Sequence, residues 1–133
     1  MTTQSTRGYG PVVQEHFHRP RNVGFFDEAQ ADVATAEVGS RQEGGVIRLQ
    51  LRVDGSGIIK DSCFKAYGCG ATIVAASWVS EWVKGKSLPQ ARSLTSTELV
   101  QALSLPPVKT HCALLAEDAV KAAVDHYMQR ESS

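Results

Sequence analysis

Three side chains of this sequence, Cys69, His111 and Cys112, are best suited to chemistry, because thiolate and imidazole are ligands that iron and zinc prefer. Cys69 lies between two glycines, where the backbone can approach a metal without obstruction by a Cβ atom. His111 and Cys112 are expected at the start of the last helix, where free N–H groups and the dipole favour a thiolate and lower its pKa. The pattern indicates a ligating or nucleophilic site. Spacing alone leaves open that both cysteines are ordinary buried residues and that His111 is a surface residue.

The remaining cysteine, Cys63, is excluded from this site. On a strand it shares a face with Asp61, Lys65 and Tyr67, so we expect it to point outward. An extended chain from Cys63 to Cys69 spans about 20 Å at about 3.3 Å per residue, which is too far for one compact site. The odd number of cysteines, 3 in all, argues against a disulfide framework and for reduced thiols.

The strands that must position these residues come first along the chain. Residues 46–53 alternate apolar and polar side chains, which predicts a half-buried strand. Turn residues at 54–57 then lead into a second strand over residues 58–67, so an antiparallel hairpin is expected. A further strand is expected around residues 35–38.

Helical patterns surround and follow these strands. A short helix is expected over residues 9–18, and a second helix after Gly70 that ends at Gly85. The Thr95-x-x-Glu98 spacing predicts a capping box, and an apolar stripe over residues 112–128 predicts a long final helix. Strands followed by helices predict an α+β domain over residues 9–130, with a small, mostly antiparallel three-stranded sheet packed against several helices. Residues 1–8 are expected to be flexible.

Composition excludes several classes of partner. Basic and acidic residues balance at 14 each, so neither nucleic acid nor an anionic membrane is an expected partner. The longest apolar stretch, residues 71–79, is far shorter than the roughly 20 residues of a membrane span. The first ten residues do not resemble a secretory signal, so we expect a cytoplasmic protein.

Four segments together resemble the IscU/NifU family of iron–sulfur cluster scaffolds, in order and in spacing. They are residues 20–24 (PRNVG), 64–70 (FKAYGCG), 81–87 (EWVKGKS) and 105–112 (LPPVKTHC). The resemblance covers nearly the whole chain from Tyr9 and implies the IscU/NifU-like fold. It also implies a scaffold that is not an enzyme. On such a scaffold a [2Fe–2S] cluster is assembled from iron and from sulfur supplied by a cysteine desulfurase, then passed to acceptor apoproteins.

The resemblance also implies roles for individual residues. Cys69 and Cys112 correspond to cluster ligands, Cys112 is a candidate persulfide acceptor, and His111 is an adjacent or alternate ligand. Residues 105–109 resemble the segment bound by the family's DnaK-type chaperone, which acts with a J-protein co-chaperone. That segment consists of Leu105, Pro106, Pro107, Val108 and Lys109. It can equally be a rigid loop that positions His111 and Cys112.

The chain departs from the family pattern just before the strand that begins at Val46. The family carries Ala-Cys-Gly-Asp there, whereas this chain has Gln-Glu-Gly-Gly, so Glu43 replaces the first ligand cysteine and Gly45 replaces the aspartate. Glutamate supplies a hard oxygen where a cluster prefers thiolate. Because family scaffolds use the aspartate in keeping the cluster labile, its loss could make this protein a holder, a regulator or a specialised carrier.

Two hypotheses for the function follow. The first is a scaffold or scaffold-like carrier that binds iron or a [2Fe–2S] cluster through Cys69, His111 and Cys112, with Glu43 as a possible fourth ligand. The second is a zinc- or iron-binding regulatory paralogue that docks on the assembly machinery without building clusters, with Glu43, Cys69, His111 and Cys112 as a tetrahedral set of ligands. With one thiolate missing, a homo-oligomer could complete the site. A hydrolase with Cys112 as nucleophile and His111 as base is disfavoured, because adjacent residues at a helix start rarely aim at one another.

Overall fold

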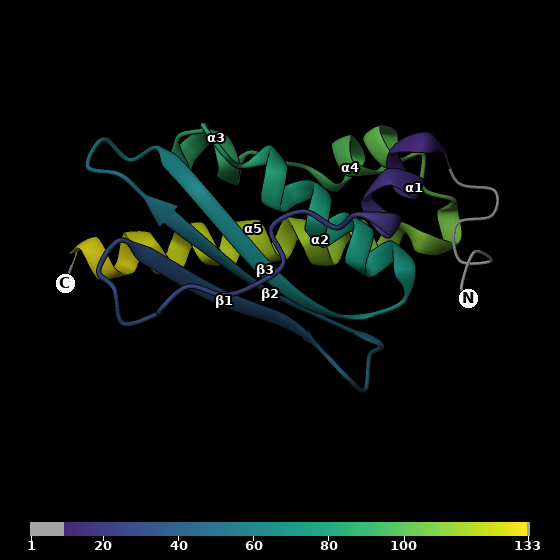
Figure 1. Ribbon diagram of the computed structural model, residues 1–133, viewed down its shortest axis with the longest axis horizontal. Helices are drawn as coiled ribbons and strands as arrows, with labels where there is room; N and C mark the ends of the chain where they lie inside the picture. The colour runs from purple at the N-terminus through teal and green to yellow at the C-terminus, as the bar shows by residue number, and fades with distance from the viewer. Residues whose placement is uncertain (1–9, 133) are drawn as a thin grey trace.

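The computed structural model describes residues 10–132, so the segment 1–8 that is expected to be flexible lies outside the described residues. After a short first helix, three consecutive strands precede the remaining helices, as the sequence predicts, and a long helix ends the chain (Figure 1). The elements are α1 (Pro11–His18), β1 (Val33–Ser40), β2 (Gly45–Val53), β3 (Ile59–Gly68), α2 (Gly70–Trp82), α3 (Leu88–Arg92), α4 (Ser96–Leu103), the 3-10 turn η2 (Pro107–Lys109) and α5 (Thr110–Ser132). The α+β class is confirmed.

The sheet is antiparallel, with its three strands in the order β1-β2-β3. Strand β2 alternates as the sequence predicts, and Ile47, Leu49 and Leu51 are fully buried on one face. Helices α2 and α5 pack against that face, with α5 lying mainly on β1 and β2 and α2 mainly on β3 (Figure 1). The alternation therefore produces one apolar layer between a sheet and two helices.

The opposite face of the sheet is also covered near its middle, which corrects the prediction for Cys63. Strand parity does turn Cys63 away from the helices, beside Gln50 on the neighbouring strand. The Phe26 backbone crosses this face, donates its N–H to Gln50 Oε1 at 2.7 Å and accepts from Gln50 Nε2 at 3.1 Å. Cys63 is consequently 5 % exposed rather than facing solvent, because a segment distant in sequence lies over it.

Helices α1 and α2 contact each other through a polar pair in an otherwise apolar interface. His16 is buried, and its Nδ1 lies 2.8 Å from Ser77 Oγ in α2. Burial, and then the nearby Arg21 cation, lower the pKa of His16 from its usual value. The neutral imidazole is therefore the form that fits this interface.

Capping residues fix the two short helices that follow α2. Thr95 and Glu98 form the predicted capping box at the start of α4. A second capping box, made by Ser87 and Gln90, begins α3, a helix that the sequence analysis did not predict. The Ser-x-x-Gln spacing was a usable signal for it, but the helix is only 5 residues long, too short for an apolar period to show.

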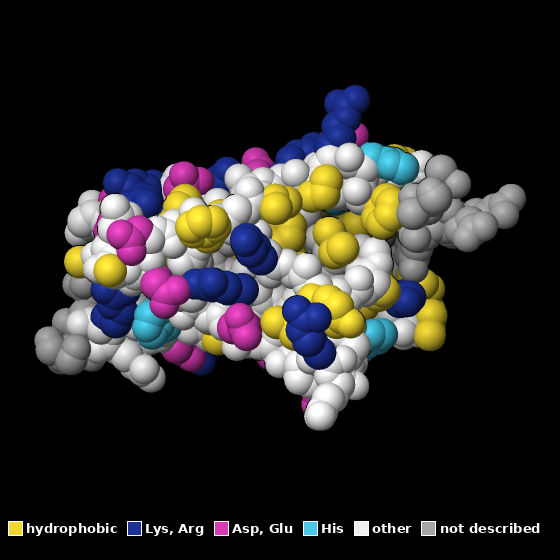
Figure 2. Space-filling view, turned by 60° about the horizontal axis from the view of Figure 1, so that its bottom comes forward, with side chains coloured by type: hydrophobic (Ala, Val, Ile, Leu, Met, Phe, Trp, Pro, Cys, Tyr) yellow, Lys and Arg dark blue, Asp and Glu magenta, His cyan; other side chains and the backbone are white. Residues whose placement is uncertain are grey.

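The uncovered part of the outer sheet face carries exposed aromatic and basic side chains together. The Lys65 ammonium lies 5.1 Å from the Phe25 ring centre, and the Arg41 guanidinium lies 4.4 Å from that of Tyr67. Figure 2 shows basic and acidic side chains interspersed over one side of the molecule, so neither sign dominates there. Among residues 10–132, no helix has the length and apolar character to cross a membrane.

Candidate metal-binding site

Two helix starts bring Cys69 and Cys112 together at one end of the molecule. Strand β3 ends at Gly68, and Cys69 is the extended N-cap residue of α2, with φ −73° and ψ 171°. Helix α5 begins at Thr110, so Cys112 lies in its first turn. Because α2 packs against α5, the two sulfur atoms lie 3.8 Å apart.

Glycines let the start of β2 approach this pair closely. Gly68 has φ +146°, and a Cβ atom there would lie 3.0 Å from the Gly44 carbonyl oxygen and 3.0 Å from Thr72 Oγ1. Gly45 pairs with Gly68 across the sheet. The hairpin turn between β1 and β2, which carries Glu43, is therefore held beside the cysteine end of α2.

Thr72 is a member of this cluster that the sequence analysis missed. Its hydroxyl oxygen lies 3.6 Å from the Cys69 sulfur and 3.4 Å from the Cys112 sulfur, and the residue is 2 % exposed. The available signal was its position three residues after Cys69, which places both side chains on one side of a helix start. The thiol pair is thus flanked by a buried hydroxyl.

Two residues next to Cys112 in the sequence also reach the sulfur atoms. Lys109 Nζ lies 3.6 Å from the Cys69 sulfur, which gives this thiol a cationic neighbour. His111 is exposed, and its Nε2 lies 3.5 Å from the Cys112 sulfur. The expectation that adjacent residues at this helix start do not meet is therefore wrong. Within residues 10–132, however, no hydrogen-bonded carboxylate orients the His111 ring, and Cys112 is fully buried.

The pKa of Cys112 is shifted in the opposite direction to the prediction, and Cys69 is the more acidic thiol. Burial opposes ionisation of Cys69, but the backbone and hydroxyl of Thr72 and the Cys112 thiol stabilise its thiolate and lower its pKa to about 7. Burial, together with the charge of Cys69, raises the pKa of Cys112. The helix start alone led us to expect a low pKa for Cys112. The prediction fails because packing of α5 removes this thiol from water.

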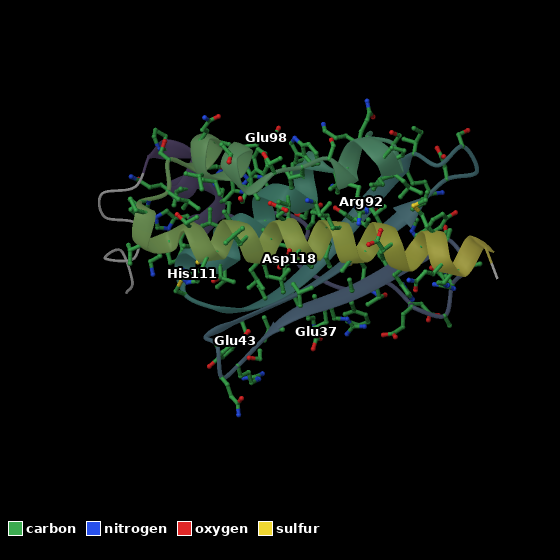
Figure 3. All side chains as sticks on the ribbon, turned by 180° about the vertical axis from the view of Figure 1, so that it is seen from behind. Glu37, Glu43, Arg92, Glu98, His111 and Asp118 are labelled. Carbon is green, nitrogen blue, oxygen red and sulfur yellow. The ribbon has the colours of Figure 1, made fainter. Side chains whose placement is uncertain are left out.

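Glu43 lies on the hairpin turn at the same end of the molecule as His111 (Figure 3). Its side chain is exposed, and its backbone N–H donates to the Ser40 carbonyl oxygen at 3.2 Å. Glu43, Thr72 and His111 line one small cleft of about 150 Å³. Neither this cleft nor a wider hollow of about 750 Å³ on the outer face of the sheet is lined by Cys69 or Cys112. The small cleft nevertheless adjoins the thiol pair, because Thr72 and His111 in its lining lie 3.4 Å and 3.5 Å from the Cys112 sulfur.

The four candidate ligands lie at one end of the molecule, but their side chains do not yet surround a single metal position. In the described part of the chain, no three His, Cys, Asp or Glu side chains lie close enough to hold one metal ion as they stand. The donor types nonetheless fit iron or zinc, since two thiols 3.8 Å apart have an imidazole and a carboxylate around the adjoining cleft. The exposed Glu43 and His111 side chains would have to move to close a site around the half-buried Cys69 and the buried Cys112.

The segment 105–109 connects α4 to this site. Leu105 is buried at 6 % exposure, whereas Val108 is 73 % exposed. Lys109 donates its N–H to the Pro106 carbonyl oxygen at 2.8 Å, which forms the 3-10 turn η2 immediately before α5. The segment therefore combines an anchored start, a rigid turn that positions the cysteine end of α5, and an exposed apolar side chain.

Comparison with known proteins finds relatives that match nearly the whole length of the chain. The model of the NifU-like N terminal domain family matches residues 8–133. The iron-sulfur cluster assembly scaffold protein IscU of Buchnera aphidicola subsp. Acyrthosiphon pisum is 48 % identical over 123 residues, covering 92 % of this chain and 97 % of that protein. The protein of the same name from Escherichia coli K12 is 46 % identical over 125 residues, covering 94 % and 98 %. The crystal structure of the N-terminal part of a NifU-like protein from Brucella abortus has a TM-score of 0.66 at 19 % identity, covering 90 % and 94 %, and shares the fold.

Proposed function

The chain belongs to the NifU-like N-terminal domain family, and we propose that it acts in iron–sulfur cluster assembly as a scaffold or scaffold-like carrier. The observation that carries the proposal is the pair of thiols 3.8 Å apart at two helix starts. The names of the relatives support this function over that of a zinc- or iron-binding regulatory paralogue. The protein binds and passes on its cargo and is not an enzyme in this proposal.

The cargo is iron with sulfide, as a [2Fe–2S] cluster or as iron before a cluster forms. Cys69 and Cys112 supply the two sulfur ligands, since their positions need no rearrangement of the backbone. His111 and Glu43 supply nitrogen and oxygen for the remaining positions, as side chains of the adjoining cleft. An oxygen ligand holds sulfide-rich iron less firmly than a thiolate, so this site favours transfer of the cargo over storage.

Sulfur arrives as a persulfide of a cysteine desulfurase. The half-buried Cys69 is the more accessible thiol, and its thiolate attacks the terminal sulfur of the donor persulfide. The donor S–S bond breaks, the donor leaves as a thiolate, and Cys69 becomes a persulfide. Cys112, the sequence-based candidate acceptor, then receives the same sulfur from Cys69 across 3.8 Å, after its own proton has been lost.

The remaining partners are proposed from the family. A DnaK-type chaperone with its J-protein binds residues 105–109, where the exposed Val108 side chain is available for an apolar contact. Acceptor apoproteins receive the cluster in the cytoplasm. A second copy of the chain can supply a missing ligand in a homo-oligomer, since the described residues of one chain do not close a metal site as they stand.

Metal and acid-labile sulfide analysis with a visible spectrum tests the proposal, on protein purified anaerobically and reconstituted with a cysteine desulfurase, cysteine and iron. The variants are Cys69→Ser and Cys112→Ser, and Cys63→Ser on the far face of the sheet is the matched control. Equal amounts of iron and sulfide, retained in the control and lost in both site variants, support a scaffold. Zinc or iron without sulfide would instead support the regulatory paralogue, and absence of any metal would refute both.

A further inference from the structure

The buried hydroxyl of Thr72 has an unusual set of partners. Within residues 10–132, its hydrogen bonds are to the sulfur atoms of Cys69 and Cys112, at 3.6 Å and 3.4 Å. A hydroxyl that is 2 % exposed needs good hydrogen bonds to offset the loss of water. Thiols are weak acceptors, whereas an ionised sulfur is a much stronger one. The Thr72 hydroxyl therefore makes its strongest hydrogen bond when one of the two sulfurs is ionised, as a sulfur is when it binds a metal.

Thr72, together with Leu115, borders the space that a side chain at position 45 would enter. A Cβ atom built on Gly45 would lie 3.2 Å from Leu115 Cδ2, 3.5 Å from Thr72 Oγ1 and 3.6 Å from Thr72 Cγ2. A larger side chain at position 45 would therefore point at the same buried region between α2 and α5. An aspartate at position 45 would therefore pack against both Leu115 and Thr72, so a change at one of these positions affects the room available at the other.

We propose that Thr72 is a positioning residue of the cargo site, whose hydroxyl bridges the Cys69 and Cys112 sulfurs in the space left by Gly45. A hydroxyl has one proton to donate and two lone pairs to accept with. With one sulfur ionised, the hydroxyl donates to that sulfur and accepts from the thiol of the other. With both sulfurs bound to the cargo, the hydroxyl would donate to one of them and so help to hold the two sulfurs close together. The inference rests on the proposed function and adds a residue to its site.

The first test uses the apoprotein, so that its outcome does not depend on cluster binding. Thr72→Val keeps the branched shape and removes the hydroxyl, whereas Thr72→Ser keeps the hydroxyl and removes a methyl group. Alkylation of Cys69 is followed against pH by peptide mass spectrometry. We expect the midpoint of the Thr72→Val profile to rise by about one pH unit, as for loss of a hydrogen bond to a charged sulfur, while Thr72→Ser stays close to wild type.

The second test examines the shared space. Gly45→Asp, Thr72→Ala and the double variant are compared by thermal unfolding. We expect Gly45→Asp to lower the Tm in the wild-type background and to lower it less when Thr72 is already alanine, because residues in contact are not additive. Additive Tm changes would overturn the shared-space argument. A Thr72→Val profile that matches wild type, or a Thr72→Ser profile that moves with it, would overturn the bridging role.

The cargo measurement separates the two proposals. Failure of wild type to bind iron and sulfide refutes the proposed function but leaves the apoprotein profiles interpretable. If wild type does bind, the bridging role predicts faster loss of cargo to an apo-acceptor or chelator in Thr72→Val than in Thr72→Ser. Equal loss rates in the two variants would overturn the effect on cargo.

Discussion

The acidity of Cys69 is the property of this site that responds most directly to a simple perturbation, a change of pH. Its sulfur is half-buried, lies near the Lys109 ammonium and contacts the Thr72 hydroxyl, and its pKa is lowered to about 7. Cys112 is fully buried and its pKa is raised. We therefore predict that an electrophile such as iodoacetamide modifies Cys69 selectively near neutral pH.

The size of the effect follows from the two pKa values. At pH 7 about half of Cys69 is thiolate, compared with about 3 % for a peptide thiol with a pKa of about 8.5. That fraction is about 16-fold larger, but the lower pKa makes the thiolate about 4- to 6-fold less nucleophilic. The net expectation is alkylation about 3- to 4-fold faster than that of an ordinary exposed thiol, reduced to the extent that partial burial limits access.

The assay is peptide mass spectrometry of wild-type protein after brief alkylation between pH 5.5 and 9.5. The Cys69 profile should have its midpoint near pH 7, and Cys112 should react at least about tenfold more slowly throughout, because it is buried. A short cysteine peptide is the external control. A Cys69 midpoint near pH 9, or faster modification of Cys112, would refute the electrostatic reasoning about the site.

Further predictions concern the core, the α1–α2 interface and the hairpin turn. Leu49→Ala should lower the free energy of unfolding in urea by about 2–5 kcal/mol, because Leu49 is fully buried between sheet and helices. Burial lowers the pKa of His16 in the folded protein. Neutral His16 should therefore contribute fully to stability above its pKa in the unfolded chain, about 6.5, and this contribution should be lost as pH falls through the lower pKa of the folded state. His16→Gln should flatten that part of the stability profile; an unchanged slope would contradict this. Glu43→Cys with Gly45→Asp should raise cluster occupancy in desulfurase-driven reconstitution, because the first change replaces a hard oxygen ligand with a thiolate; no increase would mean that another feature limits assembly.

Local sequence patterns were sufficient for most of the fold. Alternation over residues 46–53 identified β2 and its buried face, because one side of that strand packs on helices. The capping box at Thr95 located the start of α4, because that motif satisfies backbone N–H groups within one turn. These features depend on neighbours a few residues apart, which the sequence displays directly.

The errors arose where a distant segment decides the environment of a side chain. Cys63 has the predicted parity, but the Phe26 segment covers it through Gln50. Cys112 has the predicted place at a helix start, but contact between α2 and α5 buries it and raises its pKa. No local pattern reports either contact, since each joins residues far apart in the sequence.

The site has a fixed half and an adjustable half, and this division gives the departure at Glu43 its physical meaning. Cys69, Thr72 and Cys112 are held by packed helix starts, whereas Glu43 is exposed on a turn. A cysteine at position 43 would bring a third soft ligand on that adjustable half, while glutamate brings a longer side chain with a hard oxygen. In the function proposed for this site, the thiol pair and the Thr72 hydroxyl would therefore set most of the affinity for cargo. The turn would then govern how readily the cargo leaves, because an exposed oxygen ligand can be replaced without disturbing the core.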